Sequence, residues 1–216
     1  MCGRFINLTK TNLIKKKFNI NNSINKDFIS YNISPSQISC IIYKEKQINL
    51  DLAKWGYSFY DKKENQERVI INSRLETIRN KFLFKESYIK RKCILPINGY
   101  YEWSLLDGNK IPYFINIPKS EPMYLAGIWK YIDSKENNKK IFSIITKNAN
   151  KYLSNIHHRM PVVLSVEEGE EYLDDNNSSF LNKNFLSSLE IELDFYKVSK
   201  FVNNPLNNSN ECLKSI

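Results

Sequence analysis

Residues 93–117 read CILPINGYYEWSLLDGNKIPYFINI, which are two apolar stretches separated by the polar residues Asp107, Gly108 and Asn109. Aromatic and β-branched residues favour extended strands, and a Gly-containing polar segment between two such runs favours a turn. Predicted strands follow one another at residues 93–97, 100–105, 111–117, 123–131 and 141–146. This part of the chain therefore predicts a run of antiparallel strands.

Further elements are expected on both sides of this run. Towards the N-terminus, the patterns predict an extended segment at residues 2–6, a helix at 9–18, a loop at 20–36 and a hairpin of 37–44 and 47–55. A turn-like stretch at 57–68 and a strand at 69–71 follow. The strand leads into a helix capped by Ser73 and Glu76, and a further helix is predicted at 82–90. Towards the C-terminus, they predict a short helix at 149–153, a strand after Pro161, helical segments between 166 and 189, and a last strand at 195–199. We expect a single α+β domain spanning residues 1–216, with a curved antiparallel sheet or an open β-barrel-like core flanked by helices.

The composition indicates a globular protein with an affinity for polyanions. Hydrophobic residues make up 42% of the chain and aromatic residues 13%, which excludes a disordered or coiled-coil protein. The formal charge of +9 attracts polyanions, so nucleic acid is the leading class of partner. The alternative is that lysine is simply abundant and that residues such as Lys15 to Lys17 form a solvated helix face.

The second residue, Cys2, carries unusual chemistry if Met1 is removed. Methionine is normally excised before a small residue, and the new N-terminus is then a 1,2-aminothiol. Its amine titrates near pH 7.7–8.0 and its thiol near 8.5, so both have nucleophilic fractions at neutral pH. Such a group condenses with an aldehyde to an imine, and the thiolate closes on the same carbon to give a thiazolidine. By itself, a cysteine at position 2 is more often incidental.

Several short motifs, taken together, resemble one protein family. They are Met1-Cys2-Gly3-Arg4-Phe5, Tyr31-Asn32-Ile33-Ser34-Pro35, Trp55-Gly56, Asn72-Ser73-Arg74-Leu75-Glu76-Thr77, Gly99-Tyr100-Tyr101-Glu102-Trp103, Thr146-Lys147-Asn148-Ala149-Asn150 and His157-His158-Arg159-Met160-Pro161. Their order and their span of nearly the whole chain resemble the SRAP family, the SOS response-associated peptidases. The family often has Ala in place of Ser73, Phe in place of Tyr100, and Ala-Asp in place of Ile97-Asn98.

The resemblance implies a function in the response to DNA damage: covalent crosslinking to abasic sites in single-stranded DNA, which shields the lesion. It implies that Cys2 is the nucleophile, Asn72 orients its amine and thiol, Glu102 transfers protons, and His157 assists opening of the sugar. These side chains suit the roles, because an amide both donates and accepts hydrogen bonds and a partly buried carboxyl can hold or release a proton. Outside the family match, Asn72 is an ordinary turn or cap residue and Glu102 an outward-facing strand carboxylate.

Contacts with DNA are expected from a second group of residues. Arg4, Arg74 and Arg159 each follow a proposed site residue by two positions, which on an extended chain places them on the same face. Arginine forks suit phosphates, and Trp55 and Trp103 can stack on unpaired bases. The alternative for the arginines is an ordinary ion pair with a carboxylate such as Glu76.

Two other functions remain open at this point. One is a cysteine peptidase in which the same residues hydrolyse an amide, and removal of its own Met1 is one form of that activity. The other is a single-stranded DNA binder that holds its ligand only by ionic and stacking contacts. We expect no metal site, because the only two histidines are adjacent, and no cofactor.

The expected cellular location follows from two features that the sequence lacks. No apolar run approaches the roughly 20 residues that span a bilayer, and no secretory signal precedes the four dispersed cysteines. We therefore expect a reduced, monomeric protein without a membrane partner, in the cytoplasm and on the nucleoid when bound to DNA, or in the nucleus of a eukaryote.

Overall fold

The computed structural model describes residues 2–21, 24–118, 122–132, 139–174 and 179–216. The strands are β1 (Arg4–Asn7), β2 (Ser30–Ile33), β3 (Ile38–Lys44), β4 (Ile48–Trp55), β5 (Tyr57–Asp61), β6 (Gln66–Ile70), β7 (Asn72–Arg74), β8 (Lys92–Ile97), β9 (Gly99–Leu106), β10 (Asn109–Asn116), β11 (Met123–Tyr131), β12 (Lys140–Asn148), β13 (Arg159–Pro161), β14 (Val163–Leu164) and β15 (Asp194–Lys197). The helices are α1 (Thr11–Lys17), α2 (Phe82–Lys90) and α3 (Val166–Asp174), with short 3-10 turns η1 (Ser188–Ile191), η2 (Lys200–Asn203) and η3 (Asn210–Leu213).

The larger sheet has the order β13-β12-β4-β3-β8-β11-β14, and β7 adds to β12. In addition, β11 near one end of this order pairs with β12 near the other end. Part of this sheet is therefore ring-like. Most pairs are antiparallel, but β4 and β7 both run parallel to β12. The α+β class and the curved antiparallel core predicted from the sequence are therefore confirmed.

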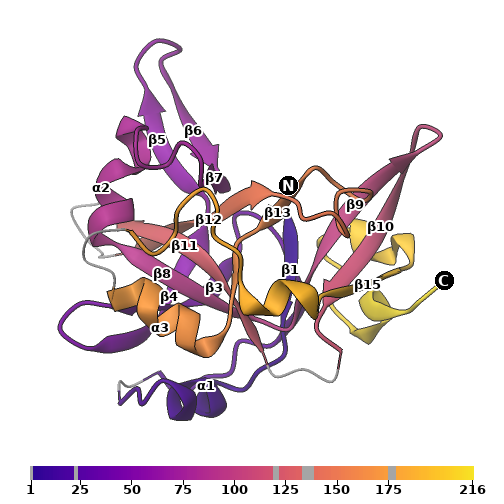
Figure 1. Ribbon diagram of the computed structural model, residues 1–216, viewed down its shortest axis with the longest axis horizontal. Coiled ribbons are helices and arrows are strands. Elements are labelled where there is room, and N and C mark those ends of the chain that lie inside the picture. The colour runs from indigo at the N-terminus through magenta and orange to yellow at the C-terminus, as the bar shows by residue number, and fades with distance from the viewer. Residues whose placement is uncertain (1, 22–23, 119–121, 133–138, 175–178) are drawn as a thin grey trace.

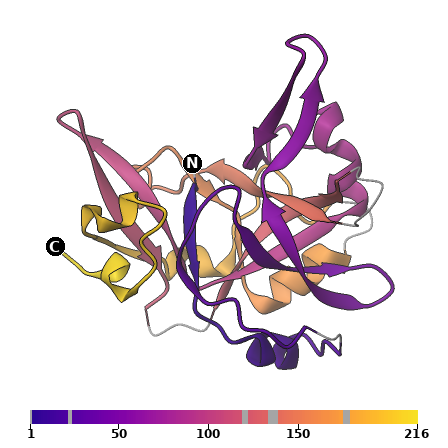
Figure 2. The ribbon, with the colours of Figure 1, turned by 180° about the vertical axis from the view of Figure 1, so that it is seen from behind.

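The smaller sheet, in the order β15-β10-β9-β1-β2, carries the N-terminal strand in its interior. Strand β1 pairs with β9 on one side, with Phe5 opposite Tyr100, and with β2 on the other. Because both edges of β1 are hydrogen-bonded, the start of the chain is held by the sheet rather than left to fray. In Figures 1 and 2, β1 begins between two hairpins, β5–β6 and β9–β10, that project from the body of the molecule.

A large aromatic core joins the two sheets. Phe5 from the smaller sheet packs against Trp55 of the larger sheet, with ring centroids 5.1 Å apart, and Trp55 stacks on Phe142 at 6.2 Å. Cys2 lies in the same cluster and is completely buried. Burial of apolar surface at this junction therefore fixes how the N-terminal strand sits on the rest of the fold.

The helices α2 and α3 pack on the other face of the larger sheet (Figure 1). Tyr88 of α2 and Tyr172 of α3 are buried, and their hydroxyls donate to the carbonyls of Leu181 and Gly127 at 2.7 and 2.9 Å. These bonds satisfy the polar ends of large apolar side chains. Within the described residues, no helix is both long and apolar enough to cross a bilayer.

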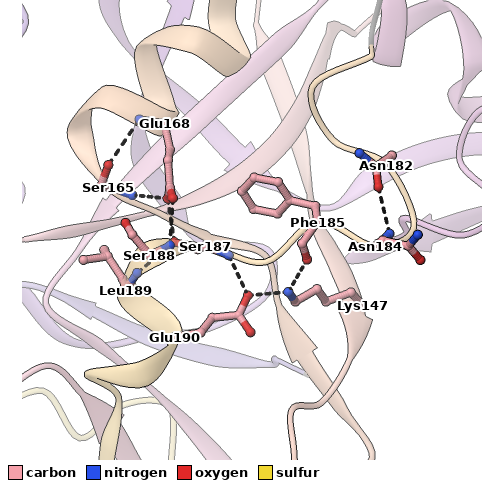
Figure 3. Close-up of polar contacts among 10 residues, drawn as sticks. All are labelled: Lys147, Ser165, Glu168, Asn182, Asn184, Phe185, Ser187, Ser188, Leu189 and Glu190. Atoms are coloured by element: carbon pink, nitrogen blue, oxygen red, sulfur yellow. Dashed lines mark hydrogen bonds and ion pairs between the residues drawn. The ribbon is translucent and has the colours of Figure 1, made fainter.

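A buried ion pair anchors η1, in the segment before β15, to β12 of the larger sheet. Lys147 of β12 and Glu190 of η1 are 8% and 2% exposed and form an ion pair, and the Lys147 ammonium also donates to the carbonyl of Phe185 at 2.7 Å. Figure 3 shows this pair beside a second carboxylate, Glu168 of α3, which accepts hydrogen bonds from Ser187 and Ser188. Two carboxylates from different elements therefore fix η1 in place.

Several predicted elements are confirmed: the 37–44 and 47–55 hairpin is β3–β4, residues 82–90 form α2, and the strand run corresponds to β8 to β12. Residues 57–68 were predicted as turn-like, but they form most of the hairpin β5–β6. Predicted loop residues 20–36 include β2.

Two predicted helices are wrong for identifiable reasons. Ser73 does not cap a helix, because β7 pairs in parallel with β12 and Glu76 turns instead to Arg159. Residues 149–153 are not helical and only 151–153 form a turn, since the Asn150 side chain accepts from the amides of Tyr152 and Leu153 and competes with helical bonding.

The substitution Gly99→Ala tests the close approach of β9 and β10. A Cβ at residue 99 would lie 2.2 Å from Cζ of Phe114 and 2.8 Å from the carbonyl oxygen of Ile115. We expect the free energy of unfolding to fall by about 1–3 kcal/mol, as overpacking usually does. Urea denaturation measures this, with the exposed Leu105→Ala in the same strand as a control that shifts stability by less than about 0.5 kcal/mol. Equal stability of Gly99→Ala and the wild type would contradict this packing.

Candidate active site

Cys2 and Asn72 are 70 positions apart in the sequence but in contact in the fold. The side-chain amide of Asn72 donates a hydrogen bond of 2.8 Å to the backbone carbonyl of Cys2. Asn72 begins β7, which is held by its parallel pairing with β12, and both residues are buried. The structure therefore brings together two of the residues predicted for the site. Met1, whose removal was predicted, lies outside the described residues.

The Cys2 thiol is strongly disfavoured as a thiolate in this structure. Burial is the main cause of a raised pKa, and the negative charge of Glu102 raises it further, whereas the backbone amide of Arg4 lowers it. The thiol is therefore protonated at neutral pH while it is enclosed in this way. Reaction at this sulfur requires groups that stabilise the negative charge as it forms.

Glu102 and His157 form the second half of the site. Oε1 of Glu102 and Nδ1 of His157 are 3.9 Å apart, with side chains that are 6% and 22% exposed. Burial lowers the pKa of His157, and the nearby Glu102 carboxylate opposes that shift only in part. The imidazole is therefore neutral at pH 7 and able to accept a proton.

Hydrogen bonding assigns the tautomer of His157. The backbone amide of Arg159 donates to Nδ1 at 2.9 Å, so we infer that Nε2 carries the proton in the neutral ring. The exposed ring of His158 stacks on His157, with centroids 4.3 Å apart and planes at 25°. These contacts hold the imidazole plane in one orientation beside Glu102.

A groove of about 450 Å³ opens the Glu102–His157 pair to solvent. It is lined by Arg4, Glu102, Trp103, Lys110, His157 and Asn203. The Arg4 guanidinium lies over the Trp103 ring at 5.8 Å, and the Trp103 indole donates to Asn203 at 2.8 Å. An anionic ligand that enters this groove therefore meets two cations and a partly exposed aromatic ring before it reaches the buried groups.

The residues predicted to contact DNA fall into different environments. Arg4 is half-buried and donates to the Asn32 side chain at 2.7 Å and to the carbonyl of Val202 at 2.8 Å, while its plane faces Trp103. Arg74 is exposed at the end of β7. Trp103 is partly exposed in the groove. A DNA contact by any of these three stays a prediction.

Trp55 and Arg159 require a correction. Trp55 is 0% exposed, and its indole donates to the carbonyl of Ile71 at 2.9 Å, so its ring cannot stack on a base in this structure. Arg159 is 6% exposed and forms a bidentate pair with Glu76 at 2.7 and 2.9 Å. Its guanidinium also donates to Asn148 and to the carbonyl of Thr146. The alternative of an ion pair with Glu76 is therefore what the structure shows for Arg159.

Other residues near the site were not predicted from the sequence. Lys110 and Asn203 line the groove, and no local pattern singles them out, because their place depends on the β9–β10 hairpin and on η2. Tyr100 lies two positions before Glu102 on β9, a spacing that puts both side chains on the same face of the strand. That spacing is a signal that the sequence already contained. In the described part of the chain, no group of three or more potential metal ligands occurs.

The chain is similar to one protein family and to several known proteins. The family model described as "SOS response associated peptidase (SRAP)" matches residues 1–205. The chain is 34% identical to the abasic site processing protein YoqW of Bacillus subtilis, over all of both chains, and 34% identical to YoaM of the same organism, over 99% of this chain and 97% of that protein. It is also 27% identical to the abasic site processing protein HMCES of Gallus gallus, over 87% of this chain and 66% of that protein. A crystal structure of a protein from Bacteroides thetaiotaomicron shares the fold, with a TM-score of 0.81 at 22% identity over all of both chains.

The ion pair of Glu76 makes a prediction about acid stability. Burial raises the pKa of Glu76, but hydrogen bonds and positive charge from Arg159 outweigh burial and hold the pKa below its usual value. A carboxyl with a depressed pKa stabilises the fold above its unfolded pKa, near 4.3, and the contribution is lost as pH falls through the folded value. We expect Glu76→Gln to unfold about 1–3 kcal/mol more easily at pH 7 and to lose less stability on acidification than the wild type.

Urea unfolding between about pH 3 and pH 7 checks this expectation. The matched control is Glu67→Gln, which removes an exposed carboxylate from β6 and should follow the wild type at every pH. Parallel stability curves for the wild type and Glu76→Gln would contradict the prediction, because they would show that ionisation of Glu76 contributes nothing to the pH dependence of stability.

Proposed function

The chain belongs to the SOS response associated peptidase (SRAP) family, and from that membership we propose that it processes abasic sites in DNA by bonding covalently to them through Cys2. The observation that carries the proposal is the meeting of Cys2, Asn72, Glu102 and His157 beside a groove that contains Arg4 and Lys110. The site contains a nucleophile, a pair of proton-transfer groups and an entrance suited to an anionic chain.

The reaction begins from Cys2 as the N-terminal residue, after Met1 has been removed. The Cys2 amine adds to the aldehyde carbon of the ring-opened abasic sugar, and water leaves to give an imine. The Cys2 thiolate then attacks the imine carbon, the nitrogen takes up a proton, and a five-membered thiazolidine closes. Because both nucleophiles sit on one residue, ring closure is intramolecular and has a high effective concentration.

The remaining side chains supply proton transfer and orientation. His157, neutral at pH 7, accepts or returns a proton at the sugar oxygen as the ring opens, and Glu102 handles the protons of the amine and of the departing water. The side-chain amide of Asn72 already holds the backbone carbonyl of Cys2 by a hydrogen bond. The amine and the thiol of Cys2 therefore stay at fixed positions relative to the groove. This chemistry is a lyase-like crosslinking rather than a hydrolysis.

Single-stranded DNA is the proposed form of the substrate. A duplex encloses the abasic sugar behind the opposite strand, whereas in a single strand the sugar and its neighbours are open. The groove joins a cationic face to the partly exposed Trp103, which suits a flexible chain of phosphates with unstacked bases. The formal charge of +9 assists the encounter with such a chain.

The test uses a single-stranded oligonucleotide with one abasic site and protein whose N-terminus has been checked by intact mass. We expect the wild type to give a band that resists heat and denaturant on a denaturing gel, and Cys2→Ala to give none, because the thiazolidine needs the sulfur. An oligonucleotide without the lesion is the control. A band of equal strength from Cys2→Ala would sink the proposal.

The same assay separates the two alternatives. A non-covalent binder gives complexes on native gels that weaken steeply with salt and leave no band under denaturing conditions. A peptidase that uses this site to remove Met1 gives Cys2→Ala protein that keeps Met1 when it is made without methionine aminopeptidase. Loss of Met1 from that variant would exclude self-processing.

Proton transfer by Glu102 makes a quantitative prediction. Glu102→Gln keeps the size and the hydrogen-bonding ability of the side chain but loses the proton-transfer group. We expect crosslinking at pH 7 to slow by at least about 100-fold, the lower end for a general acid–base residue. Gel time courses measure the rate, with Glu67→Gln as the exposed control. An unchanged rate would assign Glu102 a structural role.

A further inference from the structure

Tyr100 is a buried residue of the site whose hydroxyl is unused in this structure. Its side chain is 1% exposed and lies in the same core cluster as Cys2. Among the residues that the structure describes, no hydrogen-bond partner reaches its hydroxyl. Burying a hydroxyl without a partner costs free energy, so an apolar ring of the same shape would suit a purely structural position better.

The strand geometry directs Tyr100 toward the reactive residues. Tyr100 and Glu102 are two positions apart on β9, so their side chains project from the same face of that strand. Tyr100 also lies opposite Phe5 in the β1–β9 ladder, and β1 is the strand that leads directly from Cys2. Asn72, which bonds to the Cys2 carbonyl, also has an unused polar atom, because its Oδ1 is buried without a partner in the described residues.

A second carboxylate, Glu190, acts electrostatically on Tyr100. Burial is the main cause of a pKa far above the ordinary value for this phenol, and the charges of Cys2, Glu102 and Glu190 raise it further. Glu190 is the carboxylate that Lys147 holds in Figure 3, and it is 2% exposed. Tyr100 therefore keeps its proton at any physiological pH and can act only as a neutral hydrogen-bond donor or acceptor.

We propose that the Tyr100 hydroxyl stabilises the Cys2 thiolate by donating a hydrogen bond to the sulfur when that sulfur ionises. The inference rests on the proposed function, since it adds a residue to the same reactive site. In the enclosed form the thiol is neutral and does not require the donor. When negative charge develops on the sulfur, the hydroxyl has no competing partner among the described residues, and a hydrogen bond from it favours the thiolate where the chemistry requires it.

The other groups around the thiol are consistent with this role. The backbone amide of Arg4 is one donor that favours the thiolate, whereas Glu102 disfavours it. A second donor, the Tyr100 hydroxyl, would lower the pKa of the Cys2 thiol and so oppose burial and the Glu102 carboxylate, which both raise it. The charged or titratable groups that act on Cys2 or on Tyr100 are Glu102 of β9, Glu190 of η1 and the α-amine of the chain.

The adjacent tyrosine provides a matched control. Tyr101 is also fully buried on β9, but its hydroxyl donates to the carbonyl of Tyr31 at 3.0 Å and its ring packs in a different cluster. Tyr100→Phe and Tyr101→Phe thus remove the same atom from neighbouring positions on opposite faces of one strand. Only the first change removes a group from the face that carries Glu102.

The experiment measures the ionisation of Cys2 without DNA. Protein lacking Met1, verified by intact mass, is alkylated with iodoacetamide at a series of pH values, and modification of the N-terminal peptide is followed by mass spectrometry. We expect the midpoint for Cys2 to rise by about one pH unit in Tyr100→Phe, the size of one hydrogen bond to a charged group, and to stay unchanged in Tyr101→Phe. An unchanged midpoint in Tyr100→Phe would overturn the inference.

Two further readings separate this inference from the proposed function. Crosslinking to the abasic oligonucleotide at pH 7 should slow by up to about tenfold in Tyr100→Phe, in proportion to the loss of thiolate. If no variant crosslinks but the alkylation midpoint still shifts, the proposed function fails and the role of Tyr100 stands. If Tyr100→Phe destabilises the fold as much as Tyr101→Phe does, the hydroxyl is structural and the inference is wrong.

Discussion

The position of β1 inside the smaller sheet is the constraint on which the rest of the structure depends. The first residues of a chain usually fray, but here β9 and β2 hydrogen-bond both edges of β1, and Phe5 packs on Trp55 between the sheets. Cys2 therefore begins in a fixed place, and Asn72 can bond to its carbonyl from the other sheet. The nucleophile that we propose, although it lies near the end of the chain, thus has the fixed position of a core residue.

The cost of this arrangement is a set of polar groups inside an apolar junction. Burial disfavours the thiolate of Cys2 and the charged form of His157, and the Asn72 carbonyl oxygen and the Tyr100 hydroxyl are buried without partners in the described residues. Such groups lower stability, and a scaffold must hold them in place. The ion pairs Arg159–Glu76 and Lys147–Glu190 provide that scaffold, because each ties a loop or turn to β12 or its neighbour β13.

The candidate site shows how much of this could be predicted from residues alone. Cys2, Asn72, Glu102 and His157 were identified by the motifs that carry the family resemblance, and the fold brings the pairs Cys2–Asn72 and Glu102–His157 into contact. Residue type and spacing did not distinguish Trp55 from Trp103, although one is a core residue and the other lines the groove. Burial depends on which elements pack together, and a short motif contains no information about that.

The sequence by itself determined the fold class, the strand run from β8 to β12 and the β3–β4 hairpin, because period-two apolar patterns and turn residues act over a few positions. Only the tertiary structure decided that residues 72–74 join β12 as a strand, that Arg159 pairs with Glu76, and that Tyr100 lies in the same buried cluster as Cys2. These outcomes depend on contacts between segments far apart in the chain. Long-range pairing outweighs local preference there, since residues 72–74 gain ladder hydrogen bonds and burial beside β12 that a locally capped helix does not offer.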